Sequence, residues 1–364
     1  MYRLLYISCL SVVFYGIFIL IVRYGLFLVQ QNNILQHDLP FVSIVVAVRN
    51  KSNTVLKCLN ALVHQDYPRH LYEIIVVDDA SSDCTHERLP KFCQKNKINL
   101  LHNPVREKYK SSKKTALELA VATSRADILL FADADCFPPS SWIRGMIRHF
   151  DKTVGFVAGF SPQTTDHKLA RRIMEIDAAS AAIVSAATIG FGRGVTCTGR
   201  NLAYRKKALQ DIGGFAALPD SLSGDDDFVL QAVSRHPSWR VAYALDQNAA
   251  VPAAGPNNLR RFLQQKKRHL SAGKYFPPSV QLSFAVYHAL NLLLWAVTFI
   301  GVWTMPLLCF PFAFKLLFDY SLLRFFLAQF NMTFHVRDFI FWQVLFIFYN
   351  AVIGPIAMLT KIKW

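Results

Sequence analysis

The sequence predicts an α/β domain built around a mostly parallel β-sheet, with membrane-spanning helices before and after it in the chain. In the middle of the 364-residue chain, short runs rich in β-branched residues alternate with segments of helical periodicity, which is typical of a parallel sheet covered by helices. At both ends, apolar stretches are long enough to cross a bilayer. We therefore expect an N-terminal anchor at residues 1–30, a globular domain at 38–278 and a C-terminal membrane region at 279–364.

The N-terminal apolar stretch favours an uncleaved anchor. Residues 4–22 carry no charge, and Arg23 closes the stretch. A cleaved signal peptide is the alternative, but its apolar core is usually shorter, and no clear small-residue cleavage site follows here.

The C-terminal region is predicted to contain two or three helices. Residues 282–303 and 339–360 are each long enough to span the hydrocarbon layer. The stretch between them, 306–318, is shorter and carries Lys315, so it spans the bilayer, re-enters it or lies at its surface. With 53% hydrophobic residues overall, the chain is predicted to be an integral protein of the cell inner or plasma membrane.

The formal net charge of +16 does not indicate nucleic-acid binding, because no RNA-binding motif, zinc finger or heptad array accompanies it. Basic residues beside membrane helices fit the positive-inside rule and attraction to anionic headgroups. The seven cysteines are scattered and form no C-x-x-C pair, which favours a reducing compartment over a disulfide framework. We expect a cytoplasmic globular domain that binds no nucleic acid, and the sequence leaves the oligomeric state open.

Acidic residues gather at the carboxyl ends of the predicted strands. Asp78 and Asp79 close one strand, and Asp133 and Asp135 close another. Ligands of open parallel sheets bind beyond the carboxyl ends of the strands, so these aspartates should share one rim. The expected strands are 41–48, 73–83, 98–103 and 127–135, and the expected helices between them include 54–65 and 113–124.

The D-x-D pair at Asp133 and Asp135 is the first candidate metal site. Alternate residues of a strand point to the same face, so both carboxylates should reach one cation. Oxygen-only ligands suit Mg²⁺ or Mn²⁺, which typically also bind substrate phosphates. Aspartates at a strand end are equally ordinary turn formers, and the pair alone does not decide between these two interpretations.

Six motifs occur in order between residues 41 and 275: FVSIVVAVRN, EIIVVDDASSDCT, KKTALELAVATSRADILLFADADCFP, TGRNLAYRKKALQDIGGF, SGDDDFVLQAV and QKKRH. In this order they resemble the motifs of the family 2 glycosyltransferases, whose catalytic domain has the Rossmann-like GT-A fold. The resemblance implies inverting, metal-dependent transfer of a sugar from a nucleotide-sugar, most often a UDP-sugar, to an acceptor hydroxyl.

The resemblance also implies a nucleotide-binding site at the first two strands. Asp79 would accept hydrogen bonds from the nucleobase, with Ala47 and Arg49 flanking the ring. An Asx-turn at the strand end is the structural alternative for both Asp78 and Asp79, and the role of Asp78 stays open.

The diphosphate end of the donor would meet the D-x-D pair. By resemblance Asp135 would hold the Mg²⁺ or Mn²⁺ ion, and Asp133 would face the metal or the ribose. Lys113 or Lys114 would neutralise diphosphate charge, although a solvated helix start explains either lysine nearly as well.

The acceptor side is predicted from the last two motifs. Asp226 would be the general base that takes the proton of the attacking hydroxyl, and Asp225 stands where the family usually has glutamate. An acidic helix start is the alternative for one of these aspartates. Gln265 and Arg268 would bind the diphosphate or line the acceptor channel, but His269 replaces the family's tryptophan. A basic helix at the membrane surface is the alternative there.

The flanking membrane helices favour a lipid or lipid-linked acceptor over a soluble one. A processive polysaccharide synthase is the nearest alternative, although such enzymes usually have more spanning helices. A catalytically inactive membrane scaffold of the same fold is the second alternative, and the complete set of carboxylates argues against it. Neither the sugar nor the acceptor follows from the sequence.

Overall fold

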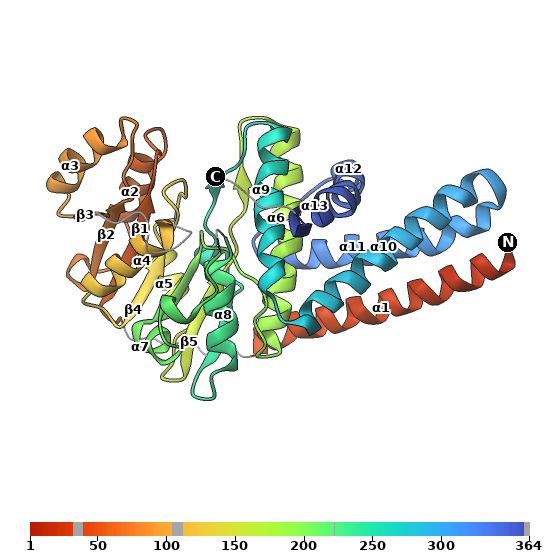
Figure 1. The fold of residues 1–364 in the computed structure, drawn as a ribbon, viewed down its shortest axis with the longest axis horizontal. Helices are drawn as coiled ribbons and strands as arrows, with labels where there is room; N and C mark the ends of the chain where they lie inside the picture. The colour runs from red at the N-terminus through yellow and green to blue at the C-terminus, as the bar shows by residue number, and fades with distance from the viewer. Residues whose placement is uncertain (32–38, 104–111, 222, 360–364) are drawn as a thin grey trace.

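The computed structural model describes residues 1–31, 39–103, 112–221 and 223–359. It shows an α/β domain from which a group of long helices projects (Figure 1). The predicted fold class is therefore confirmed.

A seven-stranded sheet forms the centre of the α/β domain, with strand order β3-β2-β1-β4-β7-β5-β8. β7 runs antiparallel to both of its neighbours, and the other pairings are parallel. The strands are β1 (Val42–Val48), β2 (Tyr72–Asp78), β3 (Asn99–His102), β4 (Ile128–Phe131), β5 (Val154–Gly159), β7 (Leu202–Arg205) and β8 (Arg240–Ala244). The central strands are buried on both faces, which explains why they are continuous apolar runs in the sequence.

Helices cover both faces of the sheet and divide the core in two. On one face α2 (Val55–Val63), α3 (Thr85–Lys95) and α5 (Trp142–Ile147) pack into one hydrophobic cluster. On the other face α4 (Ser112–Thr123), α6 (Lys168–Gly190) and α8 (Asp225–Arg235) pack into the second cluster.

The strand register brings distant segments to one rim of the sheet. Val48 of β1 lies beside Asp78 of β2, and Phe131 of β4 lies beside Leu202, the first residue of β7. Because β7 is antiparallel, the segment before it lies at the rim where β1, β2 and β4 end. The chain therefore adds one more segment to the predicted ligand-binding edge.

The D-x-D pair lies in a turn and not on a strand, so the expectation of strand alternation was wrong. β4 ends at Phe131, and the backbone N–H of Cys136 donates to the carbonyl of Asp133 at 3.0 Å. Asp133 and Asp135 face the same rim because of this turn, rather than because alternate strand residues share a face.

Five helices of the described chain are long and apolar enough to cross a membrane, judged by length and composition. Three lie in the C-terminal region, and the middle one runs from Pro306 to Ala328, well beyond the predicted 306–318. The five are α1 (Tyr2–Gln31), α6, α10 (Pro278–Thr304), Pro306–Ala328 with α11 (Phe310–Ala328), and Val336–Leu359, in which α12 (Val336–Phe348) and α13 (Gly354–Leu359) flank a π-helical turn.

The fifth apolar helix, α6, was not anticipated from the sequence. A larger share of it is buried than of the other four, and it contacts β5 and β8 as well as α1, α11 and α12. Figure 1 shows α6 crossing α1, α10 and α11, which run side by side. Gly25 of α1 and Gly190 of α6 meet at the crossing, where a side chain on either would collide with the other helix. α6 therefore joins the sheet to the other apolar helices.

Candidate active site

The ends of β1 and β2 bring predicted nucleotide-binding residues together. Asp79 is buried, accepts a hydrogen bond from Asn103 Nδ2 at 2.7 Å, and lies 3.8 Å from Arg49 Nη1. Asp78 instead accepts the backbone N–H of Ser81 at 3.0 Å and thereby stabilises the turn after β2. The two neighbouring aspartates therefore differ in their surroundings. Asp79 lies at the rim beside Arg49, and Asp78 stabilises the turn.

Two residues at this rim hold a left-handed backbone conformation. Asn50 and Ala80 both have φ of +51°, which is uncommon for residues with a side chain. The two turns are bonded together, since Asn50 N–H donates to Ser81 Oγ at 3.1 Å and Ser82 N–H donates to Asn50 Oδ1 at 2.8 Å. Such strain concentrates at ligand sites, and here it fixes the backbone around Arg49 and Asp79.

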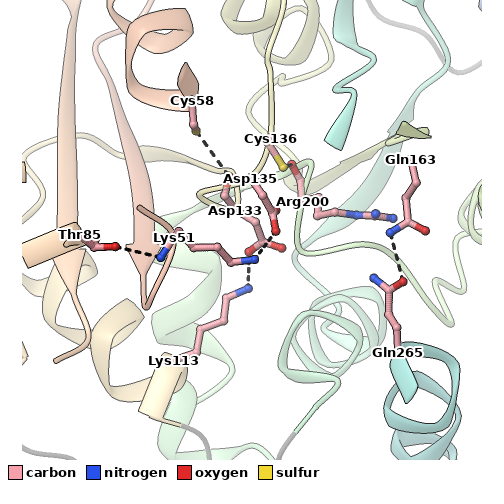
Figure 2. A network of polar contacts seen from close by, with 10 residues as sticks. All are labelled: Lys51, Cys58, Thr85, Lys113, Asp133, Asp135, Cys136, Gln163, Arg200 and Gln265. Atoms are coloured by element: carbon pink, nitrogen blue, oxygen red, sulfur yellow. Dashed lines mark hydrogen bonds and ion pairs between the residues drawn. The ribbon is translucent and has the colours of Figure 1, made fainter. Parts of the chain in front are cut away.

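Each aspartate of the D-x-D turn contacts a different lysine (Figure 2). Lys51 Nζ lies 2.5 Å from Asp135 Oδ2, and Lys113 Nζ donates to Asp133 Oδ1 at 2.7 Å. Burial alone would raise the pKa of Asp133, but Lys113, with smaller contributions from Arg200 and Lys51, holds that pKa below its ordinary value. Asp133 is therefore charged at neutral pH.

The D-x-D turn fits a divalent cation whose remaining ligands come from a substrate. Two carboxylates supply only oxygen atoms, and Mg²⁺ is usually bound by one or two carboxylates together with water and phosphate oxygens. Among the residues that the structure describes, no cluster of three or more Asp, Glu, His or Cys side chains is arranged to hold a metal. The donor set therefore suits an ion shared with a bound diphosphate better than a permanent structural ion.

A small pocket connects the D-x-D turn to the start of α8. A Cβ atom at Gly199 would collide with the carboxylate of Asp226, so any other residue here would displace that side chain. The structure thus brings Asp226 beside Asp133, with Lys113 between them. The pocket is lined by Val45, Ala47, Lys113, Leu117, Phe131, Ala132, Asp133, Gly199 and Asp226.

The three aspartates at the start of α8 have different surroundings. Asp225 is buried, Asp226 lines the pocket, and Asp227 accepts the N–H of Cys197 at 2.8 Å and the hydroxyl of Thr196 at 2.9 Å. Burial raises the pKa of Asp226 and raises the pKa of Asp227 to about 7. A raised pKa makes Asp226 a better proton acceptor at neutral pH, whereas Asp227 anchors the segment before β7.

α9 (Leu259–Ser271) brings Gln265 and Arg268 toward the D-x-D turn. Gln163 Nε2 donates to Gln265 Oε1 at 3.3 Å. Burial lowers the pKa of Arg268, and the carboxylates of Asp133 and Asp135 oppose this shift because they favour its charged form. His269, at the position of the family's tryptophan, is exposed. No indole is available there to stack on a substrate.

Sequence reasoning did not identify Lys51, Arg200 or Asp227 as members of the site. Lys51 directly follows a strand end, and Arg200 lies inside the quoted TGRN motif, so both carried a positional signal. The sequence did not single out Asp227, because three consecutive aspartates do not reveal which of them lines the pocket and which does not.

The seven-stranded, mostly parallel sheet with a D-x-D turn at its rim defines a GT-A domain. Residues 43–213 match the family model described as "Glycosyl transferase family 2". The α/β domain therefore belongs to this family over the matched residues, which make up just under half of the chain.

Two curated relatives show the range of the similarity. "Glycosyltransferase AglE" of Haloferax volcanii is 34% identical over 123 residues, covering 33% of this chain and 39% of that protein. A "Beta-monoglucosyldiacylglycerol synthase" of Trichormus variabilis is 29% identical over 119 residues, covering 32% of this chain and 25% of that protein. The chain thus matches less than half the length of either relative.

A solved structure shares the fold over nearly the whole chain. The mannosyltransferase PcManGT of Pyrobaculum calidifontis, in complex with GDP-Man and Mn²⁺, matches with a TM-score of 0.59 and 17% identity. The match covers 98% of this chain and 99% of that one, so the shared fold includes the long apolar helices as well as the sheet.

Proposed function

We propose that this protein transfers a sugar from a nucleotide-sugar, most readily a UDP-sugar, to a hydroxyl group of a lipid or lipid-linked acceptor, with inversion at the anomeric carbon. The observation that carries the proposal is the convergence of Lys113, Asp133 and Asp226 on one pocket at the carboxyl rim of the sheet. This pocket combines a cation, a candidate metal ligand and a candidate base.

The nucleotide is proposed to bind along the rim from β2 to β4. Asp79 and Arg49, 3.8 Å apart, would hold the base, with Ala47 beneath it. Asp133 and Asp135 would hold a Mg²⁺ or Mn²⁺ ion, which would stabilise the negative charge that develops on the diphosphate leaving group. Lys113 adds a positive charge at the same place.

Asp226 is proposed to act as the general base of a single displacement. The acceptor oxygen forms a bond to the anomeric carbon as the bond to the diphosphate oxygen breaks, and the hydroxyl proton passes to the Asp226 carboxylate. Burial raises the pKa of Asp226, which improves its affinity for that proton at neutral pH. Gln265, Arg268 and Asp225 are proposed to border the acceptor side.

A lipid acceptor is supported by the apolar helices next to the site. α9 packs against α13, and α1 packs against α10 and α11, so the site lies close to helices that can enter a bilayer. We propose that residues 1–30 and 279–364 form the membrane part, that residues 38–278 form a cytoplasmic catalytic domain, and that α6 lies between them. The diacylglycerol-type name of one relative points the same way.

A donor panel tests this proposal. Purified full-length protein in detergent is incubated with UDP-, GDP- and other nucleotide-sugars, Mn²⁺ and membrane lipid extract, and nucleotide release and product size are measured. We expect one donor to release nucleotide and yield a product of a single added sugar. Long polymer would instead identify a processive synthase, and no release with any donor would favour an inactive scaffold.

A further inference from the structure

Arg200 is a partly buried cation to which the proposed transfer reaction gives no role. It lies in the segment before β7, next to Gly199 of the pocket. Its Nε donates to Thr198 Oγ1 at 3.1 Å, but its Nη1 is buried and makes no hydrogen bond with any residue in the described ranges. A buried donor without a partner is costly, and native proteins usually satisfy such groups.

The backbone holds Arg200 in a fixed position. The neighbouring Asn201 is fully buried, and its Nδ2 donates to the carbonyls of Phe160 at 2.8 Å and Ala249 at 2.7 Å. Its Oδ1 accepts the indole N–H of Trp142 at 2.9 Å. The Arg200 side chain therefore starts from a rigid point, which lowers the entropic cost of binding a ligand there.

The guanidinium of Arg200 lies between the D-x-D turn and α9. In Figure 2 its side chain extends from the turn toward the hydrogen-bonded pair Gln163 and Gln265. Its charge helps to lower the pKa of Asp133 on one side and, after burial, the pKa of Arg268 on the other. Two guanidinium groups that repel each other are stabilised when an anion binds between them.

We propose that Arg200, together with Arg268, forms a phosphate-binding subsite beside the D-x-D turn. The planar guanidinium presents paired N–H donors that match two phosphate oxygens, and the unpartnered Nη1 of Arg200 is available for one of them. The phosphate belongs either to the donor diphosphate or to a phosphorylated lipid acceptor. The identity of the phosphate-bearing substrate rests on the proposed function. Binding of an anion at this subsite does not depend on whether the protein transfers a sugar.

Calorimetric titration with inorganic pyrophosphate, without metal or nucleotide, tests the subsite. Full-length wild type is compared with Arg200→Gln and with Arg193→Gln, which removes the same charge from an exposed position in the same segment. We expect Arg200→Gln to weaken binding roughly tenfold or more, the size of a lost charged hydrogen bond, and Arg193→Gln to leave it within about twofold. Absent binding by wild type, equal affinities of wild type and Arg200→Gln, or equal losses in both variants would refute the subsite.

Two further measurements identify the source of the phosphate. Weaker binding of nucleoside diphosphate with Mn²⁺ by Arg200→Gln would assign the subsite to the donor. Unchanged nucleotide binding with a raised KM for a long-chain alkyl phosphate acceptor would assign it to the acceptor, and no change in either would contradict the proposal. Failure of the proposed function has a different signature, namely no transfer from any donor while pyrophosphate binding still depends on Arg200.

Discussion

Replacing Lys266 with methionine tests the ion pair that holds α9 against α6. Lys266 Nζ pairs with Asp177 Oδ2, and the carboxylate of Asp177 is 1% exposed. Its Oδ1 accepts the Tyr349 hydroxyl at 2.5 Å and the indole N–H of Trp342 at 3.4 Å. Tyr349 begins the π-helical turn between α12 and α13, so the Asp177 carboxylate connects two apolar helices, α6 and Val336–Leu359, to the helix that carries Gln265.

The magnitude follows from what remains around the carboxylate. Removing one partner of a buried ion pair typically costs about 3–5 kcal/mol. The two remaining donors of Asp177 place the expected loss at the lower end, about 3 kcal/mol.

Urea-induced unfolding in detergent micelles, followed by tryptophan fluorescence, measures this loss. Lys266→Met should lose about 3 kcal/mol. The double variant with Asp177→Asn should recover part of the loss, because no unpaired charge remains. A Lys266→Met variant as stable as wild type, or a double variant no more stable than Lys266→Met, would show that the buried charge is not the cause.

Three other predictions concern separate parts of the molecule. Burial, aided by the adjacent charge of Arg148, lowers the pKa of His149 to about 4. The stability that the neutral imidazole contributes should therefore be complete above its unfolded pKa near 6.5, and the free energy of unfolding should fall by about 3 kcal/mol as the pH is lowered to 4. Unfolding measured as a function of pH should show no such loss for His149→Leu. Gly25→Leu should overpack the contact between α1 and Ala187 of α6 and cost about 1–3 kcal/mol, measured as a lower unfolding midpoint, whereas an unchanged midpoint would contradict the close crossing. Gly199→Ala should displace the Asp226 carboxylate and lower kcat at least tenfold, which corresponds to roughly 1.4 kcal/mol in activation free energy. Full activity with an intact fold would show that Asp226 is not held by this contact.

The first half of the fold was predictable because its strands can be recognised from the sequence alone. Buried parallel strands are continuous β-branched runs, so β1, β2, β3 and β4 begin within one residue of the predicted positions, although β2 ends at Asp78 and β4 at Phe131, before the predicted ends. β7 is different, since its antiparallel direction depends on pairing with β4 and β5, which lie far away in the sequence. α6 was missed as an apolar helix because its first half carries the charged residues Arg172 and Asp177. Arg172 pairs with Asp338 and Asp177 pairs with Lys266, and such distant partners cannot be read from the local sequence.

The sequence pointed to the carboxylates of the candidate site and to the cations Arg49 and Lys113, but not to Lys51 and Arg200. Strand ends and motif order pointed to Asp79, Asp133, Asp135 and Asp226. The pairing of Lys51 with Asp135 joins residues from different strand ends, and the unpartnered Nη1 of Arg200 emerges only when the surrounding side chains are placed.

Metal-dependent sugar transfer to a membrane lipid, with Asp226 as the base, is tested most directly with a radiolabelled nucleotide-sugar, membrane lipid extract and Mn²⁺. The measurement follows the label into the organic phase after extraction. Wild type should transfer label in the presence of Mn²⁺ and none with EDTA, and Asp226→Asn should be slower by about 10²–10⁴-fold while keeping its nucleoside diphosphate affinity. Label that stays in the aqueous phase, transfer that persists in EDTA, or wild-type transfer by Asp226→Asn would contradict the account.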